Sequence, residues 1–279
     1  MRIGRKIGEG SCSEIFEWES DNKIIKLAKS NTTYKAIQIE YEKTLAVWEM
    51  NLSVPQPFEI VEVHNRSGIV LERIYGETLK ERLFKNLIEQ SESAQTLDMR
   101  DIQLTARLLS EIHNISNIHV PPQREIVKNQ ILSVNYLNEM EKNYVINLLD
   151  SLPQSGYLCH GDPNPNNILI HNGKLVMIDW MNATIGNPET DIAEYIIMMK
   201  YAILPPDTPR QIIENFDLAR EAIIKVFMEE YTKLTGISYE QVEPWIVIVA
   251  SRKLSVDGIS EAEKQLLLQE IKSKLKGKI

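Results

Sequence analysis

Oxygen-bearing side chains gather in one short stretch near the middle of the chain. Asp162 and Asn167 lie five residues apart on a proline-containing loop, and Asp179 follows after a short predicted hairpin. Magnesium prefers oxygen ligands and usually takes few from the protein, so Asn167 and Asp179 could bind it. Asp162 would then be free to accept a proton from an attacking hydroxyl. Phosphoryl transfer needs both groups, so the stretch predicts a site for that chemistry.

A second set of residues near the N-terminus could hold phosphate groups. Gly8 and Gly10 lie in the segment 7–15, where glycines would let backbone N–H groups approach a phosphate closely. Lys26 ends the apolar run that begins at Ile24, and we expect its amine to point toward the α- and β-phosphates of a nucleotide. An ordinary turn and a surface lysine would explain the same residues without a ligand.

The elements that must position these residues change character along the chain. The first quarter has two strand–turn–strand patterns and one helical pattern, at 15–28, 58–73 and 34–48. After Gly76 the patterns are helical, at 79–90, 102–115, 126–149, 190–199, 216–235 and 261–274. One predicted hairpin interrupts them, with Asn172 and Gly173 at its turn. We therefore expect an α+β fold with a small β-rich lobe, residues 1–75, and a larger helical lobe, residues 76–279.

Composition narrows the choice of partners and compartment. The 279 residues are 43% hydrophobic and 25% charged, with a net charge of −8. That charge argues against nonspecific nucleic-acid binding and is compatible with a cationic substrate. The two cysteines suggest no disulfide framework and favour the cytoplasm, and no apolar run is long enough for membrane insertion.

The central motif resembles that of a known family. His160-x-Asp162-x-x-x-x-Asn167, a hairpin and then Ile178-Asp179-Trp180 are similar to the catalytic signature of the aminoglycoside phosphotransferase and choline kinase family. This family has a two-lobed, protein-kinase-like fold. The resemblance implies that Asp162 is the catalytic base and that Asn167 and Asp179 bind Mg²⁺. A protein kinase would have Asp-Phe-Gly at 179–181, so Asp-Trp-Met favours the small-molecule branch.

The same resemblance implies a nucleotide site in the first lobe. Segment 7–15 resembles a kinase glycine-rich loop, with Ser13 where the third glycine would stand. ATP, or GTP, is expected to contact Gly8, Gly10, Ser13 and Lys26. Adenine is expected to bond to the backbone near Glu72 and Ile74.

A glutamate on the next helix is expected to hold the lysine. Glu40 and Glu42 are the two candidates, and matching the segment 39–43 to the family places the ion pair on Glu42, with Glu40 as the alternative. Two further residues are expected to support the catalytic loop. Asp191, in a segment that resembles Gly-Asp-Pro-x-x-Asp-Leu-Ala, would bond to its backbone, and His160 would brace it.

The combined prediction is an ATP- and Mg²⁺-dependent phosphotransferase that acts on a hydroxyl of a small molecule. An aminoglycoside-like antibiotic or an amino alcohol would fit. Acidic residues of the second lobe could collect a polycation or form an ordinary solvated face: Glu189, Glu194, Glu229 and Glu230. The alternatives are an atypical protein kinase and a nucleotide-binding regulatory module of the pseudokinase type.

Overall fold

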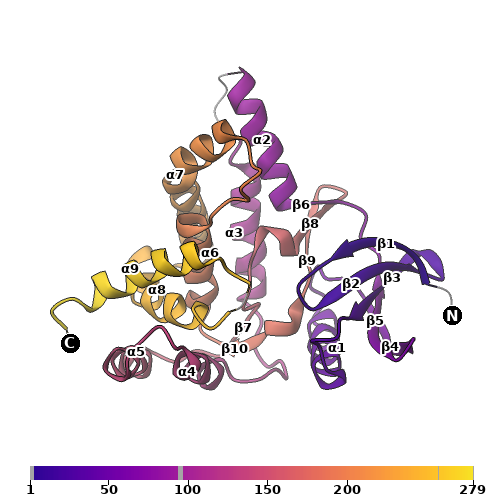
Figure 1. Cartoon of the computed structure of the whole chain (residues 1–279), viewed down its shortest axis with the longest axis horizontal. Coiled ribbons are helices and arrows are strands. Elements are labelled where there is room, and N and C mark those ends of the chain that lie inside the picture. The colour runs from indigo at the N-terminus through magenta and orange to yellow at the C-terminus, as the bar shows by residue number, and fades with distance from the viewer. Residues whose placement is uncertain (1–2, 94–96, 257, 279) are drawn as a thin grey trace. The chain divides into compact units, whose positions relative to one another are not determined.

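The computed structural model describes residues 3–93, 97–256 and 258–278, and Figure 1 labels its elements. Contacts divide the chain into two compact units. Unit 1 contains 1–79, 118–120 and 165–183, and unit 2 contains 80–117, 121–164 and 184–279. The expected boundary between residues 75 and 76 separates a nucleotide-binding lobe from a catalytic lobe, and this functional division stays a prediction. The contacts add the central hairpin to the unit that holds the first 79 residues.

Unit 1 is built on a five-stranded antiparallel sheet in the order β1-β2-β3-β5-β4. Its strands are β1 (Ile3–Glu9), β2 (Ser13–Trp18), β3 (Ser20–Ala28), β4 (Pro57–Val63) and β5 (Arg66–Glu72). Helix α1 (Tyr34–Trp48) lies beside this sheet (Figure 1). The predicted helix and the two predicted hairpins of this region are present.

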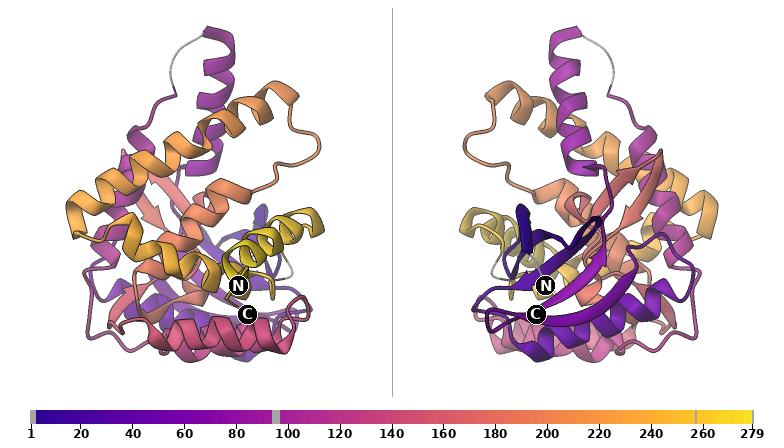
Figure 2. Two further views of the ribbon diagram at one scale, coloured as in Figure 1. Left: turned by 90° about the vertical axis from the view of Figure 1, so that its left-hand side faces the viewer. Right: turned by 90° about the vertical axis from the view of Figure 1, so that its right-hand side faces the viewer.

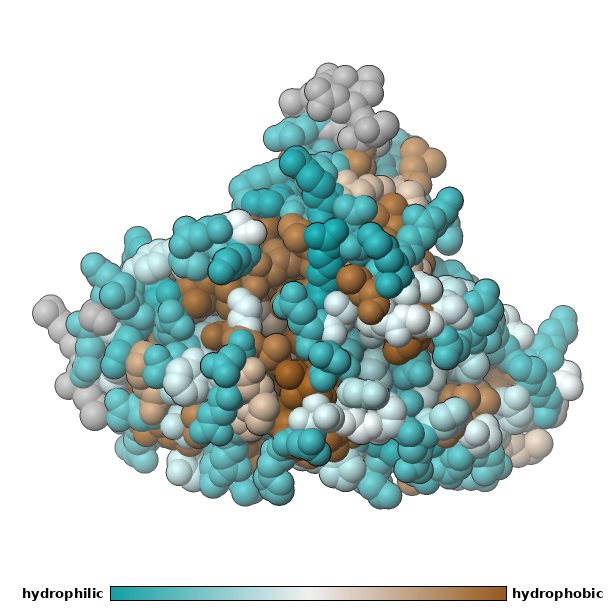
Figure 3. All heavy atoms as spheres, turned by 180° about the vertical axis from the view of Figure 1, so that it is seen from behind, coloured by the Kyte–Doolittle hydropathy of each residue, from teal (hydrophilic) through white to brown (hydrophobic). Residues whose placement is uncertain are grey.

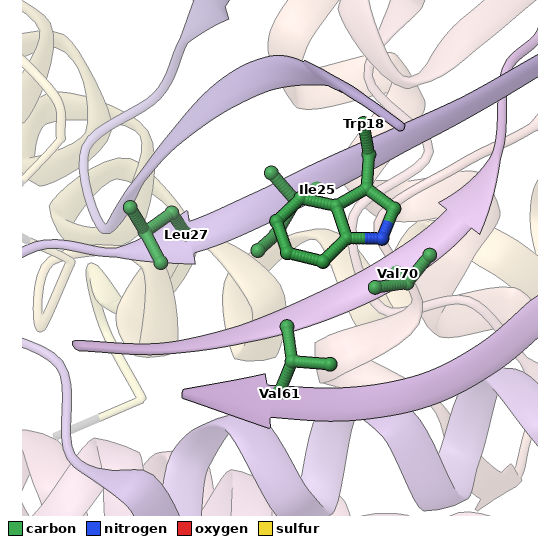
Figure 4. Packing of buried hydrophobic residues seen from close by; sticks show 5 residues of the cluster. All are labelled: Trp18, Ile25, Leu27, Val61 and Val70. Atoms are coloured by element: carbon green, nitrogen blue, oxygen red, sulfur yellow. The ribbon is translucent and has the colours of Figure 1, made fainter. Parts of the chain in front are cut away.

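Alternation along β3 gives the two faces of the sheet different roles. Ile25 and Leu27 point into one hydrophobic cluster with Trp18, Val61 and Val70 (Figure 4). Successive side chains of a strand point to opposite faces, so Lys26 and Ala28 lie on the other one.

On that other face, Ala28 packs with Ile69 and with Ile37 of α1. Lys26 therefore emerges on the side of the sheet that α1 covers.

A second, three-stranded sheet of unit 1 carries the central hairpin. It has the order β6-β8-β9, with β6 (Glu77–Thr78), β8 (Ile168–His171) and β9 (Lys174–Met177). The turn residues Asn172 and Gly173 have φ of 50° and 76°, as the Asn-Gly prediction requires. Two 3₁₀ turns flank the hairpin, η1 (Pro165–Asn167) and η2 (Trp180–Asn182).

Unit 2 is mainly helical, and Figure 2 follows its helices from two sides. They are α2 (Leu79–Ser93), α3 (Arg100–Ile112), α4 (Gln123–Ser133), α5 (Glu139–Ser151), α6 (Glu189–Tyr201), α7 (Arg210–Thr235), α8 (Tyr239–Lys253) and α9 (Glu261–Leu275). Strands β7 (Tyr157–Cys159) and β10 (Thr184–Gly186) pair antiparallel beside them. Helix α6 is buried at every residue from 190 to 199, as expected of a central helix.

Several elements differ from the sequence-based expectation. Helix α8 and the strands β1, β6, β7 and β10 were not predicted, although the other main helices and hairpins were. Hydrophilic side chains cover much of the face drawn in Figure 3. Within the described residues, none of the helices combines the length and apolar character needed to cross a membrane.

Candidate active site

Three charged side chains of unit 1 meet although they come from distant parts of the chain. The Nζ atom of Lys26 lies 2.5 Å from Glu40 Oε1 and 3.1 Å from Asp179 Oδ1. Lys26 is on β3, Glu40 is on α1, and Asp179 follows β9. Burial lowers the pKa of Lys26, but the two facing carboxylates raise it by more, so the pKa lies above its ordinary value. The cluster therefore presents a fixed ammonium group beside the predicted metal ligand Asp179.

The prediction that Glu42 holds Lys26 is wrong, because Glu40 makes that ion pair. The buried residues of α1 include Ile37, Glu40, Thr44 and Val47, which share one face at three- and four-residue spacing. Glu42 lies about 200° around the helix from Glu40. It is exposed and accepts a hydrogen bond from Gln38 instead.

The backbone brings Asn167 and Asp179 to the same end of the central hairpin. Ile168 pairs with Met177, and the Ile178 N–H donates to the Asn167 carbonyl at 2.8 Å. Asp179 has a left-handed backbone, with φ 66° and ψ 64°. Such a conformation is uncommon outside glycine and is often found at functional sites. An amide oxygen and a carboxylate at one hairpin end are donors that fit Mg²⁺.

Helix α1 also contacts the turn that follows Asp179. Lys43 is buried, one turn beyond Glu40, and its Nζ donates to the Met181 carbonyl at 2.7 Å. Burial lowers the pKa of Lys43. The sequence analysis did not predict this contact. The available signal was the position of Lys43, three residues after Glu40 and therefore on the same face of the helix.

The predicted phosphate-binding residues lie at the turn between β1 and β2. Gly8 pairs with Ile15 in the sheet, and the Gly10 N–H donates to the Ser13 carbonyl at 2.9 Å. Ser13 begins β2 and is buried. The three residues thus belong to one tight strand connection of unit 1, and their contact with phosphate stays a prediction.

The predicted adenine-binding residues lie at and just after the end of β5. The Glu72 N–H donates to the Gln56 carbonyl, and Glu72 Oε2 accepts from the Gln56 N–H. Ile74 follows two residues later and is half-buried. Glu72 is thereby tied to the segment before β4, and the adenine contact stays a prediction.

The loop that carries Asp162 belongs to unit 2, where Asp191 of α6 holds it. Asp191 is buried and accepts from the His160 N–H at 2.6 Å and from the Gly161 N–H at 2.9 Å. The Asp162 N–H faces His160 Nδ1 at 3.3 Å. The predictions that Asp191 bonds to the loop backbone and that His160 braces the loop are confirmed.

A buried chain of polar side chains extends this support. His113 Nε2 lies 3.1 Å from Asp191 Oδ2, and His113 Nδ1 lies 2.7 Å from the Tyr231 hydroxyl. The sequence analysis did not include His113 in the site, because no sequence spacing relates it to Asp191. With Asp191 on α6 and Tyr231 on α7, two helices orient the groups behind the loop.

The suggestion that four glutamates collect a polycation or form a solvated face needs correction. Glu194 is buried between Arg252 and Lys253, at 2.7 and 2.5 Å. Glu230 is also buried and pairs with Arg107 at 2.7 Å. These two carboxylates neutralise the chain's own cations, because buried charges require partners.

Solved structures with this fold define the class of protein. An aminoglycoside phosphotransferase, APH(4)-Ia, matches with a TM-score of 0.66 and 13% identity, over 99% of this chain and 93% of that one. The choline kinase LicA from Streptococcus pneumoniae matches with a TM-score of 0.62 and 15% identity, over 98% and 94%. The amicoumacin kinase hAmiN has a TM-score of 0.62 and 13% identity, over 98% and 88%. The predicted α+β, protein-kinase-like fold is confirmed.

The family follows from the sequence. The model of the phosphotransferase enzyme family, APH, matches residues 15–223, which is more than half of the chain, and the chain belongs to this family. It is a small-molecule phosphotransferase, as the motif around Asp162 predicted. No curated protein matches the sequence significantly.

Proposed function

We propose that the protein transfers the γ-phosphate of ATP to a hydroxyl group of a small molecule in a Mg²⁺-dependent reaction. The observation that carries this proposal is the cluster of Lys26, Glu40 and Asp179. A lysine held by a glutamate beside a second carboxylate is the arrangement that kinase chemistry uses for nucleotide phosphates. Adenine would be held through backbone groups near Glu72 and Ile74, and GTP is the alternative nucleotide.

Each residue has a stated task in this proposal. Lys26 binds the α- and β-phosphates, and Glu40 keeps its ammonium group in place. Backbone N–H groups around Gly8, Gly10 and Ser13 contact the phosphates. Asn167 and Asp179 would hold Mg²⁺, which would neutralise charge on the transferring phosphoryl group.

Asp162 is the proposed catalytic base. The acceptor oxygen attacks the γ-phosphorus, and the bond from that phosphorus to the β–γ bridging oxygen breaks, which releases ADP. The hydroxyl proton passes to the Asp162 carboxylate. The loop backbone around Asp162 is held by Asp191, which supports a fixed orientation for this carboxylate.

The acceptor is proposed to be a hydroxyl-bearing small molecule. Among proteins of similar fold, one structure contains ADP and hygromycin B, another contains AMP-PNP, Ca²⁺ and Ami, and a third is a choline kinase. These compounds suggest where a search for the acceptor should begin. The buried ion pairs of Glu194 and Glu230 weaken the case for a polycationic one.

A substrate panel tests the proposal. ATP consumption would be measured with hygromycin B, an amicoumacin, choline, ethanolamine and sugars, using wild-type protein and Asp162→Asn. We expect ADP release that depends on one acceptor and on Mg²⁺, and that falls by about 100-fold or more in the variant. Nucleotide affinity should change little, because Asp162 contacts the acceptor.

Other results would change the assignment. Nucleotide binding without turnover for any acceptor would favour a regulatory module. Phosphate transferred to added proteins would favour an atypical protein kinase. Unchanged turnover in Asp162→Asn would remove Asp162 from the mechanism.

A further inference from the structure

The loop that carries Asp162 has a partner outside the part of the chain that the family match covers. That match ends at residue 223, whereas helix α8 spans Tyr239–Lys253. Near the end of α8, Arg252 Nη2 donates to the Gly161 carbonyl at 3.1 Å. The residue that follows this carbonyl is Asp162, so α8 contacts the backbone next to the proposed base.

Arg252 is itself fixed by a buried carboxylate. The same Nη2 atom lies 2.7 Å from Glu194 Oε2, and Lys253 Nζ lies 2.5 Å from Glu194 Oε1. Their side chains are 13%, 4% and 10% exposed, so water screens these charges little. Two helices of unit 2, α6 and α8, therefore hold the guanidinium group in one place.

The charges in this group do not cancel among themselves. Two cations face one Glu194 carboxylate, and the nearby carboxylate of Asp162 acts on Lys253 as well. Burial lowers the pKa of Lys253, but Glu194 and, more weakly, Asp162 raise it, and the pKa lies above its ordinary value. Lys253 thus stays protonated, and Glu194, Arg252 and Lys253 together carry one excess positive charge.

The Gly161 residue is held on both sides of its Cα atom. Its N–H donates to Asp191, and its carbonyl accepts from Arg252. Gly161 has φ 82°, a conformation that side chains disfavour. Because Gly161 has this unusual conformation, the orientation of the Gly161–Asp162 peptide affects where the Asp162 side chain points. The contact from Arg252 to the Gly161 carbonyl fixes that peptide.

We propose that Arg252 is a positioning residue for phosphoryl transfer, which holds the Gly161–Asp162 peptide, and so the Asp162 carboxylate, from helix α8. This inference rests on the proposed role of Asp162 as the base. It gives a function to a C-terminal region in which the sequence shows no motif. Arg252 acts through the loop and does not contact the reacting atoms.

Two substitutions separate positioning from general stability. Arg252→Lys keeps a cation beside Glu194 but lacks the planar fork that serves two acceptors, and Arg252→Met removes the charge. The matched control is Arg210→Met, because Arg210 is 91% exposed and pairs only with Glu214 within the described residues. All three would be compared with the wild type for kcat, KM for ATP and Tm.

We expect Arg252→Lys to lower kcat about 10-fold to 100-fold, while KM for ATP changes less than about twofold. Its Tm should stay within about 4 °C of the wild type. Arg210→Met should match the wild type throughout. Wild-type kcat in Arg252→Lys would overturn the proposal, and this variant decides the question even if Arg252→Met fails to fold.

Hydrogen–deuterium exchange gives a second test that needs no acceptor. The amides of His160 and Gly161, which bond to Asp191, should exchange faster in Arg252→Lys, while β4 and β5 keep their wild-type rates. Unchanged exchange in the loop would overturn the proposal whatever the substrate is. Faster exchange would support the contact from α8 even if the wild type turned over no acceptor. The missing turnover would count against the proposed function and not against the positioning role of Arg252.

Discussion

At the scale of single residues, position around helix α1 determines which glutamate pairs with Lys26. Glu40 and Glu42 both precede Lys43 and both fit a family-like segment. Only Glu40 shares a face with the buried Ile37 and Val47, and this face turns toward the sheet side that carries Lys26. The pattern of buried positions was therefore a better guide than the motif match.

Paired substitutions of these glutamates test that assignment. We expect Glu40→Gln to lower kcat/KM for ATP about 10-fold to 100-fold, because a hydrogen bond to a charged group contributes about 1.5–3 kcal/mol. Glu42→Gln should stay within about twofold, since Glu42 is exposed. Steady-state kinetics would measure kcat/KM for ATP in both variants. A larger loss in Glu42→Gln than in Glu40→Gln would contradict the assignment to Glu40.

A second residue-scale prediction concerns acid stability. Burial raises the pKa of Asp191, but hydrogen bonds from His113 and the Gly161 backbone help to lower it by more, to below its ordinary value of 3.8. A carboxyl group with a depressed folded-state pKa stabilises the fold above its unfolded-state pKa. That contribution is lost as pH falls through the folded-state value.

Asp191→Asn should therefore have a lower Tm than the wild type at pH 7, and the difference should shrink as pH falls below about 4. Thermal unfolding between pH 3 and 7 would measure it, with the exposed Asp207→Asn as a control. A difference that grew on acidification would contradict the assignment. Hydrogen exchange at His160 and Gly161 should rise in Asp191→Asn but not in Asp207→Asn.

Spacing alone revealed part of the site at this scale. The motif predicted Asp162, Asn167 and Asp179 because sequence-local chemistry places these groups on one loop and one hairpin. It could not reveal Arg252, whose contact with Gly161 joins residues 91 positions apart. The roles of His113 and Tyr231 likewise depend on tertiary packing against α6.

At the scale of elements, period and turn chemistry predicted most helices and hairpins. Helix α8 was not predicted, because its run from Trp245 to Ala250 is rich in β-branched residues and buried throughout. Such a run shows no amphipathic period. Pro244 lies within the helix, and a proline at an interior position argues against a helix prediction. The two-residue strand β6 was too short to leave a pattern, although it extends the sheet of the central hairpin.

Gly76 offers a test of that extension. A Cβ atom at Gly76 would collide with the Ile170 carbonyl oxygen, next to the pairing of Glu77 with Ile170. Gly76→Ala should destabilise the protein by about 1–3 kcal/mol through this backbone clash. Urea unfolding would measure the change.

The matched control for this substitution is Gly156→Ala, where an added Cβ meets nothing within 4 Å. Its free energy of unfolding should stay within about 0.5 kcal/mol of the wild type. Equal effects of the two substitutions would show that β6 contributes nothing specific at Gly76.

At the scale of the whole molecule, a division by chain position does not describe the contacts. Unit 1 combines 1–79 with 165–183, and several bonds join these segments. The Met177 N–H donates to the Ser53 carbonyl, Ser53 Oγ donates to the Leu175 carbonyl, and Lys43 donates to Met181. Sequence reasoning assigned the hairpin to the second lobe, because long-range pairing of this kind leaves no local pattern.

A fragment of residues 1–79 should therefore lack a stable fold. It would lose the partners of Ser53, Lys43 and β6, and it would expose the part of α1 that contacts η2. We expect no cooperative thermal transition by circular dichroism and poorly dispersed amide resonances. The full chain is the control, and a cooperative transition of the fragment would contradict this view.

The left-handed backbone at Asp179 affects how its chemistry can be studied. An alanine there would remove the carboxylate and also impose a steric penalty, so lost activity would have two explanations. Asparagine tolerates this conformation and nearly matches the shape of aspartate, which makes it the informative replacement. Because of the positive φ at Asp179, Asp179→Asn reports on the loss of the negative charge, whereas Asp179→Ala combines that loss with a change in stability.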